Sequence, residues 1–440
     1  MKKLILVLLL PLSIAAQKNY PKLMDDYMLA LTNVKDFSGA VLVMKQGKVL
    51  LKKGYGMADR EWNIPNTTDT RFRIGSVTKQ FTAACILQLE EAGKLSLDDK
   101  LSKYYPGYPK GDSVSIHMLL NHTSGIANFT AIPGFEDVER LSWSRDSMVA
   151  WFKDKPYNFS PGSKYAYSNS GYFLLGCIVE KASGQTYDAY LRQHILDKLS
   201  MKNSGVDKLD IVLPLRARGY LKKDGETINA DFISMEWPFS AGALYSTLDD
   251  MYTWDRALYT NKILTEASRK KMFTPGKRNY GYGFVIDSLE GHFRIWHNGD
   301  IPGFSTNFSR FVNDDICTIV FSNNGINTNF VAIALADILF DVPVELPYIH
   351  KEVKIDPAIL SRYIGKYSVG ITIEMIVKDG KLYRHTNGVP DIELIPESET
   401  KFFYGDGSDR QFEFEVDAAG KVLKVWFHNS GQKGEIKKIE

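Results

Sequence analysis

Residues 75–92, GSVTKQFTAACILQLEEA, decide the fold of this 440-residue chain. Apolar side chains occupy both faces of a predicted helix that begins at Ser76, continues to about Ala92 and ends before Gly93. A helix that is apolar all round is expected to lie inside its domain. Ser76 and Lys79 are three residues apart, so at the first turn of this helix their side chains lie on one face, within reach of each other.

Ser76 and Lys79 are the residue types that nucleophilic catalysis needs. A serine hydroxyl becomes a good nucleophile only when a base removes its proton. Lys79 can be that base if burial in the apolar helix lowers its pKa. Backbone N–H groups at the helix N-terminus can stabilise an oxyanion, and Gly75 permits a tight strand-to-helix turn. Taken alone, S-x-x-K also fits a helix cap followed by a surface lysine.

Tyr167-Ser168-Asn169 is a second candidate motif, at the start of another apolar helix. The Tyr167 phenol can relay the serine proton if nearby cations stabilise its phenolate. Asn169 can orient a substrate amide or hold the lysine. An ordinary Ser/Asn helix cap after an aromatic loop is the alternative interpretation.

His297-Asn298-Gly299 is the third motif, and it follows a predicted strand at 293–296. Gly299 lets a substrate backbone approach the strand edge, and His297 can donate a hydrogen bond to that substrate. The backbone N–H of Asp300 can be a second oxyanion donor. A plain turn at the end of a strand is the alternative.

Taken together and in this order, the three motifs resemble the active-site elements of the serine β-lactamase and penicillin-binding superfamily. The tyrosine of the second motif is similar to the class C branch. That branch also holds D-alanyl-D-alanine carboxypeptidases, D-aminopeptidases and esterases. Leu119–Ile126 and Ser240–Asp249 resemble the same branch, and the resemblance extends over residues 25–340.

The resemblance implies catalytic roles for the matching residues. Ser76 would be the acylated nucleophile, and Lys79 and Tyr167 would be the proton-transfer pair. The backbone N–H groups of Ser76 and Asp300 would form the oxyanion hole.

Substrate contacts are implied for Asn169, which would position the substrate, and for His297 and Gly299 at the strand edge. His297 is also a departure from the family pattern, since β-lactamases and most penicillin-binding proteins carry a lysine there that pairs with the substrate carboxylate. Histidine is mostly neutral at pH 7. We therefore expect β-lactams and peptides with a free carboxylate to be poor substrates, and histidine here resembles the esterase and aminopeptidase members.

Hydrophobic periodicity predicts an α+β domain around these motifs. An early hairpin, helices in the middle and late strands would give a sheet that uses both ends of the domain. The expected strands are 41–44, 49–52, 283–286, 293–296, 307–311 and 316–321. The other expected helices are 18–33, 146–152, 168–182, 187–199, 247–258, 265–273 and 329–339, with pocket-shaping loops at 100–165 and 205–240.

Composition changes at 342–357, which holds three prolines and favours a domain boundary. The short alternating segments that follow, at 371–377, 381–385, 402–404, 412–416 and 422–427, are expected strands typical of a small β-barrel or sandwich. Residues 363–367 and 380–383 resemble the lipocalin-like barrel appended to some of these hydrolases. The implied role is shaping the active-site mouth or binding a partner, with passive stabilisation as the alternative. We expect a hydrolase domain at 17–345 and a barrel at 346–440.

The N-terminus predicts export. Lys2 and Lys3 precede a short apolar run at 4–12 and then small residues, so we interpret residues 1–16 as a cleavable signal peptide. The mature protein would be secreted or periplasmic, with no transmembrane segment. A retained signal anchor is the alternative.

Other features bear on ligands and partners. The formal net charge is +2 and no basic stripe is visible, so we expect no nucleic-acid partner. The histidines show no metal-ligand spacing and no phosphate-binding glycine loop occurs, so we expect neither metal nor cofactor. The three cysteines are expected to be buried free thiols, with a Cys85–Cys177 bridge as the alternative. His122 is expected to be a structural loop residue.

These observations predict an exported serine hydrolase that forms an acyl-enzyme on Ser76. Its expected substrates are small esters, or peptides and amides that contain D-residues. The alternatives are a non-catalytic or weakly acylating penicillin-binding or sensor-type protein, a β-lactamase of low activity, and a protein whose C-terminal domain carries the function. The natural substrate, the preference between ester and amide, and the oligomeric state stay open.

Overall fold

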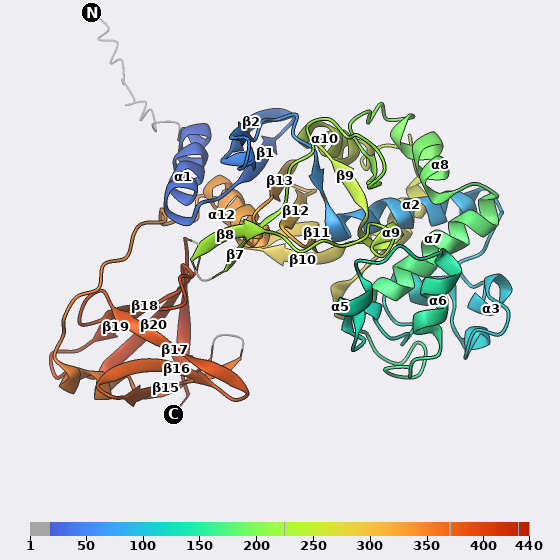
Figure 1. The fold of residues 1–440 in the computed structure, drawn as a ribbon. Coiled ribbons are helices and arrows are strands. Elements are labelled where there is room, and N and C mark those ends of the chain that lie inside the picture. Colours follow the sequence, from blue (N-terminus) through green and yellow to red (C-terminus); the bar gives the residue numbers. More distant parts are fainter. Residues whose placement is uncertain (1–17, 224, 369–370, 430, 440) are drawn as a thin grey trace, which may run out of the picture.

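The computed structural model describes residues 18–223, 225–368, 371–429 and 431–439. The predicted signal peptide lies outside these residues. A mixed helix-and-sheet domain is followed by a small β-barrel at its side, which confirms the predicted fold class (Figure 1). Within the described residues, no helix combines the length and the apolar character that crossing a membrane requires.

A six-stranded antiparallel sheet forms the centre of the larger domain, in the order β10-β11-β12-β13-β1-β2. The early hairpin joins the late strands because β1 pairs with β13, which places Ala40 opposite Phe321. Both ends of the domain therefore build one sheet, as predicted. The strands are β1 (Gly39–Lys45), β2 (Lys48–Tyr55), β10 (Val285–Leu289), β11 (His292–Ile301), β12 (Phe304–Phe311) and β13 (Ile316–Ser322).

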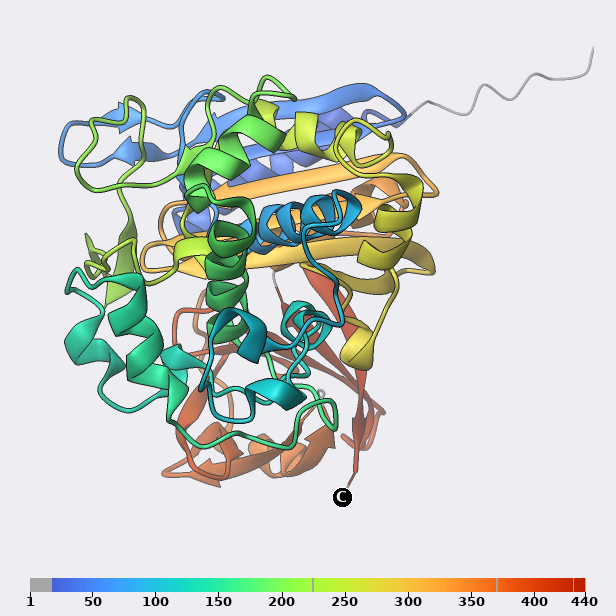
Figure 2. The same ribbon diagram turned by 90° about the vertical axis from the view of Figure 1, so that its right-hand side faces the viewer.

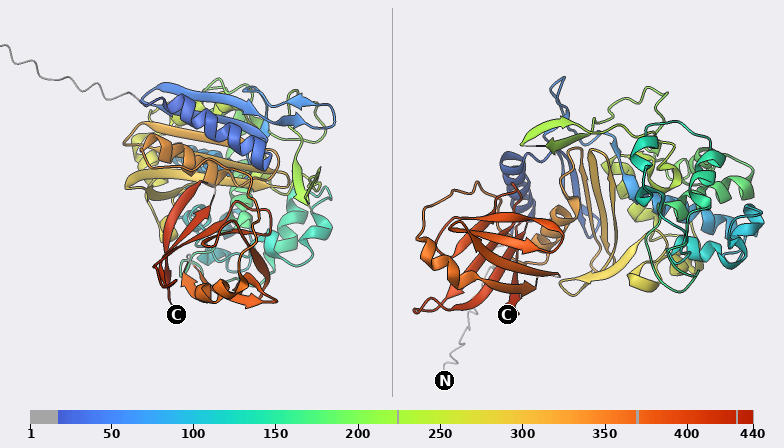
Figure 3. Two further views of the ribbon diagram at one scale, coloured as in Figure 1. Left: turned by 90° about the vertical axis from the view of Figure 1, so that its left-hand side faces the viewer. Right: turned by 60° about the horizontal axis from the view of Figure 1, so that its bottom comes forward.

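Both faces of this sheet are buried, because successive strand residues point to opposite faces. On β1, Leu42 belongs to the apolar core that contains α2, whereas Val43 belongs to the core that contains α1 and α12. Figure 3 shows α1 and α12 across one face, and Figure 2 shows α2 on the other. These helices are α1 (Tyr20–Lys35), α2 (Thr78–Glu91) and α12 (Thr328–Leu339).

The remaining helices lie on the α2 side of the sheet (Figure 2). The predicted helix at 187–199 is divided, since α8 passes into a π-helical turn, Arg192–Leu196. The helices are α3 (Leu101–Tyr104), α4 (Ile116–Leu120), α5 (Phe135–Val138), α6 (Arg145–Lys153), α7 (Asn169–Ser183), α8 (Tyr187–Leu191), α9 (Phe239–Gly242), α10 (Leu248–Ala257) and α11 (Glu266–Met272). The 3-10 turns are η1 (Gly75–Val77), η2 (Gly111–Ser113), η3 (Phe129–Ala131), η5 (Lys277–Asn279) and η6 (Pro357–Tyr363).

The segment 205–240, predicted as a loop, contains a β-hairpin that periodicity did not reveal. Its strands, β7 (Tyr220–Lys223) and β8 (Glu226–Asn229), are mostly polar and exposed, so they lack the apolar alternation of a half-buried strand. The other short strands are β3 (Met57–Asp59), β4 (Ile64–Pro65), β5 (Phe72–Arg73), β6 (Gly205–Val206) and β9 (Leu244–Ser246).

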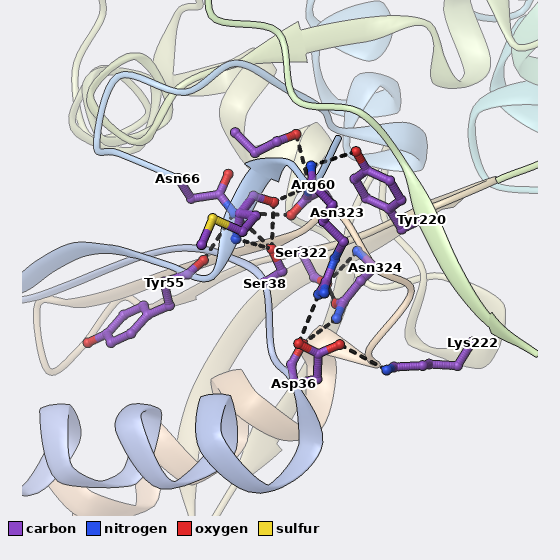
Figure 4. A network of polar contacts seen from close by, with 12 residues as sticks. Asp36, Ser38, Tyr55, Arg60, Asn66, Tyr220, Lys222, Ser322, Asn323 and Asn324 are labelled. Carbon is purple, nitrogen blue, oxygen red and sulfur yellow. Dashed lines mark hydrogen bonds and ion pairs between the residues drawn. The ribbon is translucent and has the colours of Figure 1, made fainter. Parts of the chain in front are cut away.

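A polar network holds this hairpin to the end of β13 (Figure 4). The Asn323 side chain accepts a hydrogen bond from Asn66 Nδ2 at 3.1 Å and donates to the Arg218 carbonyl oxygen at 2.8 Å. On the hairpin itself, Lys222 pairs with Asp36 at 2.9 Å. Buried hydrogen bonds of this kind specify one arrangement, so they position the segment that follows the hairpin and leads to α9.

The C-terminal strands form a closed antiparallel barrel of eight strands. Of the two architectures expected for this segment, the structure therefore shows the barrel and not the sandwich. Strands β14 and β21 pair and close it, so none of its described strands is an edge strand. Three of its strands, β14, β17 and β21, had no expected counterpart. The strands are β14 (Gly365–Ser368), β15 (Thr372–Lys378), β16 (Lys381–Thr386), β17 (Val389–Pro396), β18 (Lys401–Tyr404), β19 (Gln411–Val416), β20 (Val422–Asn429) and β21 (Gln432–Lys438).

The barrel contacts the layer formed by α1 and α12. Lys35 of α1 pairs with Asp409 at 3.3 Å, and Gln432 Nε2 donates to the Asp337 carboxylate of α12 at 2.9 Å. Since α2 lies on the opposite face of the sheet, the barrel is separated from α2 by the sheet (Figure 3).

All three cysteines are buried and free, so the alternative of a Cys85–Cys177 bridge is wrong. Burial raises the pKa of each thiol. The thiols therefore stay protonated and pack as small apolar side chains.

Candidate active site

Strand β11 crosses η1 at two glycines, and this crossing builds the site. Gly75 has φ +50°, and a Cβ added to it would lie 2.8 Å from the backbone nitrogen of Asp300. A Cβ added to Gly299 would lie 2.0 Å from the Ile74 carbonyl oxygen and 2.9 Å from the Ser76 nitrogen. Glycine at both positions is therefore what lets the two backbones approach, and the approach brings the Ser76 and Asp300 backbone nitrogens to the same crossing.

A buried threonine fixes this crossing. Thr306 Oγ1 lies 2.9 Å from the Ile74 carbonyl oxygen and 3.2 Å from the Gly299 carbonyl oxygen, so its hydroxyl can bond to either backbone. Among the described strands, β10 pairs with β11 only as far as Trp296, which leaves the edge of β11 free from the third motif onward.

Lys79 has three polar partners. Its Nζ lies 2.9 Å from Ser76 Oγ, 2.8 Å from Asn169 Oδ1 and 2.7 Å from the Ala241 carbonyl oxygen. The side chain is fully buried, and burial lowers the pKa of Lys79 well below its ordinary value.

A neutral Lys79 amine has two N–H donors and one lone pair. Asn169 Oδ1 and the Ala241 carbonyl oxygen can only accept, so they take the two donors. The lone pair is then left for the hydroxyl proton of Ser76. This is the geometry of a base in contact with a nucleophile.

The Tyr167 ring lies against this amine, with its centroid 4.8 Å from Lys79 Nζ. Burial raises the pKa of the Tyr167 phenol well above its ordinary value, although an interaction with the Ser76 hydroxyl opposes that rise. The phenolate considered from the sequence is therefore disfavoured, and Tyr167 is a neutral phenol that can donate a proton.

Both interpretations of the second motif apply at the start of α7. Ser168 is the N-cap, and its Oγ accepts a hydrogen bond from the Gly171 N–H at 3.3 Å. Its neighbours Tyr167 and Asn169 contact Lys79 from the two sides of this cap. The cap therefore sets where the two flanking side chains lie.

His122 contacts Tyr167 and the residues on each side of it. Its carbonyl oxygen accepts from the Ala166 N–H at 3.0 Å, and its Nδ1 accepts from the Ser168 N–H at 3.2 Å. The two rings are 4.4 Å apart between centroids. Burial lowers the pKa of His122 well below its ordinary value, so the ring is neutral and Nδ1 stays available as an acceptor.

His297 is buried, and both of its ring nitrogens have partners. Nε2 lies 2.9 Å from the Tyr280 hydroxyl, and Nδ1 lies 2.5 Å from the Asn298 carbonyl oxygen. Burial lowers the pKa of His297 to about 3, with the nearby Lys79 acting in the same direction. The side chain therefore carries no positive charge, and the third motif offers no cation for a substrate carboxylate.

A cavity of about 160 Å³ opens beside the nucleophile. Its walls are mostly apolar, with two carboxylates, and no described residue beyond 302 lines it. The lining residues are Ser76, Phe129, Thr130, Phe135, Glu139, Asn169, Ile233, Pro238, Ala241, Gly242, Asp300, Ile301 and Pro302. The barrel therefore takes no part in this cavity, although a role in shaping the active-site mouth was implied for it.

A larger cavity of about 490 Å³ lies behind the segment 232–239, and none of the predicted site residues lines it. We place the site at the smaller cavity because the nucleophile opens into it. In the described part of the chain, no group of three His, Cys, Asp or Glu side chains could hold a metal ion.

Sequence reasoning missed three contributors to this site. Ala241 acts through its carbonyl oxygen, which no residue-type signal reveals, although the stretch Ser240–Asp249 was singled out. Tyr280 holds His297 without belonging to any motif. Glu139 lies in a region predicted only as loops and short helices, with no pattern to mark it.

Comparisons with known proteins show what this chain is similar to. Residues 30–339 match the Beta-lactamase family. Penicillin-binding protein 4* of Bacillus subtilis (strain 168) is 30% identical over 417 residues, which cover 88% of this chain and 92% of that protein.

Two solved structures extend the comparison. The octameric penicillin-binding protein homologue from Pyrococcus abyssi is 25% identical, with a TM-score of 0.68 over 94% of this chain and 99% of that one. The D-amino acid amidase from Ochrobactrum anthropi SV3 is also 25% identical, with a TM-score of 0.63 over 74% of this chain and 97% of that one.

Proposed function

Because this chain belongs to the Beta-lactamase family, we propose that it is a serine hydrolase whose acyl-enzyme forms on Ser76. The 2.9 Å contact between Lys79 Nζ and Ser76 Oγ, beside a cavity that Ser76 lines, carries the proposal. A neutral amine in contact with a hydroxyl can remove its proton at neutral pH.

In the first step, Lys79 takes the hydroxyl proton while Ser76 Oγ attacks the carbonyl carbon of the substrate. The carbonyl oxygen becomes an oxyanion, and the backbone N–H groups of Ser76 and Asp300 donate to it. Tyr167 gives its phenol proton to the leaving alcohol or amine and recovers a proton from the Lys79 ammonium.

In the second step, water hydrolyses the acyl-enzyme. Lys79 takes a proton from the attacking water, and the same two backbone N–H groups hold the second oxyanion. The bond between Ser76 Oγ and the acyl carbon then breaks, Oγ regains its proton, and the carboxylic acid leaves.

The substrates that we propose are small esters, or peptides and amides that contain D-residues. A small, largely apolar cavity supports this choice, and so does the likeness to a D-amino acid amidase. The neutral, buried His297 supports weak turnover of β-lactams, because it supplies no cation to their carboxylate.

Hydrolysis of p-nitrophenyl butyrate by residues 17–440 tests the nucleophile. We expect Ser76→Ala to lose turnover by about a thousandfold or more, and Ser163→Ala, at an exposed serine, to retain it. Equal turnover by wild type and Ser76→Ala would overturn the assignment of Ser76.

A second candidate is a penicillin-binding protein that is acylated but turns over slowly. The similarity to penicillin-binding protein 4* over most of both chains favours it. Incubation with a fluorescent penicillin distinguishes the two: a stable, stoichiometric label on Ser76 supports the second candidate. Rapid nitrocefin hydrolysis would contradict the second candidate. It would also contradict the weak turnover of β-lactams that we expect of the hydrolase.

We further propose that residues 1–16 are removed on export and that a boundary near 345 separates the two domains. The relatives named as penicillin-binding proteins and the composition of the N-terminus support export. N-terminal sequencing of the protein from a periplasmic or secreted fraction tests it: Gln17 as the first residue is expected, and an intact Met1 would contradict it.

A further inference from the structure

We propose that Glu139 selects substrates for this site by binding a protonated amino group close to the acyl group that Ser76 attacks. The proposal rests on the proposed hydrolase function, because Glu139 and Ser76 line the same cavity. It names the substrate class as esters or amides of apolar amino acids with a free amino group.

The backbone holds Glu139 firmly beside the cavity. Its N–H donates to the Phe135 carbonyl oxygen at 2.9 Å, and its own carbonyl oxygen accepts from the Ser234 N–H at 2.8 Å. The preceding residue, Val138, accepts from the buried indole of Trp237 at 3.0 Å. A side chain on such a well-anchored segment can determine specificity, because the segment loses little further conformational entropy when a substrate binds.

The Glu139 carboxylate is half-buried, and within the described residues it has no ion-pair partner. The neighbouring Arg140 pairs with Asp231 instead, at 3.2 Å. No described residue forms a hydrogen bond or an ion pair with the Glu139 carboxylate. Burial raises the pKa of Glu139, and repulsion from Asp231 and Glu136 adds to the rise, although Arg140 opposes it. A cation placed here would stabilise the charged carboxylate.

The rest of the cavity repels anions. Of the described residues that line it, two are acidic, Glu139 and Asp300, and none is lysine, arginine or histidine. Lys79 does not line the cavity, and burial lowers the pKa of Lys79 well below its ordinary value. A free carboxylate on the substrate would therefore meet like charge, whereas an ammonium group would meet complementary charge.

The apolar walls indicate what accompanies the ammonium group. Phe129, Phe135, Ile233 and Ile301 line the same cavity as Glu139 and Ser76. They suit an aliphatic or aromatic side chain, because such a group loses contact with water on binding.

Two matched substrates test the proposal with the mature protein: D-phenylalanine p-nitroanilide, with a free amine, and its N-acetyl derivative. We expect the free amine to be preferred in kcat/KM by about tenfold at pH 7. Glu139→Gln should abolish the preference through KM, with little change for the N-acetyl substrate. Glu136→Gln, in the short helix α5 that Glu139 caps and outside the cavity, should keep the preference.

The pH dependence gives an independent readout. A free α-amino group loses its proton above about pH 8, so the preference should fade there in the wild type. Calorimetric binding of D-phenylalanine amide and N-acetyl-D-phenylalanine amide to Ser76→Ala removes turnover from the measurement, and the free amine should bind more tightly.

The outcomes separate the two proposals. Equal kcat/KM for both substrates, with turnover that depends on Ser76, would overturn the role of Glu139 and leave the hydrolase function standing. An unchanged preference in Glu139→Gln would overturn it as well. Turnover independent of Ser76 would overturn the hydrolase proposal, while tighter binding of the free amine by Ser76→Ala would still support Glu139.

Discussion

Lys79 is buried without any carboxylate partner among the described residues. Its contacts are a hydroxyl, an amide oxygen and a backbone carbonyl oxygen, none of which carries a full negative charge. Desolvation therefore acts unopposed and favours the neutral amine in the folded protein. The same burial that makes Lys79 a base costs stability, because an unfolded lysine is charged at neutral pH.

The stability of the protein should consequently depend on the protonation of Lys79. Between its lowered folded pKa and the unfolded value of about 10.4, the unfolded chain binds a proton that the folded chain does not. Stability should therefore rise with pH in this window, by up to about 1.4 kcal/mol per pH unit. Lys79→Met should flatten the plot of unfolding free energy against pH in this window. Lys94→Met, at an exposed lysine, is the control, and equal slopes for both variants would contradict the argument.

His122 is a positioning residue for Tyr167, because its carbonyl oxygen and Nδ1 hold the two flanking backbone N–H groups. We expect His122→Ala to lower kcat by about 10- to 100-fold with a smaller change in KM, since misplacement affects proton transfer more than binding. His122→Asn should recover part of the loss, because its Oδ1 can replace Nδ1 as acceptor and asparagine tolerates the positive φ of 60°. An unchanged kcat in His122→Ala would count against this role.

At the scale of elements, the crossing of η1 and β11 sets the geometry of the proposed oxyanion hole. Two glycines and Thr306 permit the close approach of the two backbones. Strand β11 continues past the end of its pairing with β10, so the same segment both builds the sheet and forms a wall of the cavity.

Gly299→Ala should damage both folding and catalysis. The new Cβ would lie 2.0 Å from a backbone oxygen, so β11 and η1 must separate. We expect a loss of about 1–3 kcal/mol in the unfolding free energy from urea denaturation, and a fall in kcat of about a hundredfold as the oxyanion donors move apart. Gly434→Ala is the control, because a Cβ there meets nothing within 4 Å. Wild-type kcat in Gly299→Ala would show that the donors lie elsewhere.

At the scale of the whole molecule, the barrel and the proposed active site lie on opposite faces of the central sheet (Figure 3). The barrel covers part of α1 and α12, and its Gln432 bonds to the buried Asp337. Burial raises the pKa of Asp337, and the bond from Gln432 opposes that rise. This arrangement favours a stabilising role for the barrel over a role in shaping the cavity beside Ser76.

Removal of residues 346–440 should therefore leave the chemistry intact. We expect kcat/KM for p-nitrophenyl butyrate within about twofold of the full chain and a lower melting temperature, because the face of α1 and α12 becomes exposed. Circular dichroism would show whether the shortened chain is folded. Gln432→Leu in the full chain isolates one contact: it should lower stability without changing kcat/KM. A folded but inactive truncation would show that the barrel acts on the site.

The sequence by itself was sufficient for the α+β class, the order of the main helices and strands, and the choice of Ser76 and Lys79 as neighbours. Each of these follows from residues close together in the chain, through periodicity or a three-residue spacing on a helix. The barrel was also recognisable, although the polar strand β21 was not, because pairing with β20 and β14 rather than apolar alternation creates it.

Only the tertiary structure decided what depends on contacts between distant residues. It placed the Ala241 carbonyl oxygen on Lys79, buried His297 against Tyr280 and brought Glu139 to the cavity. It also placed the barrel behind the sheet. The physical reason is that burial, charge and hydrogen-bond partners belong to the folded surroundings of a side chain, whereas the sequence records only its chemical type and its neighbours.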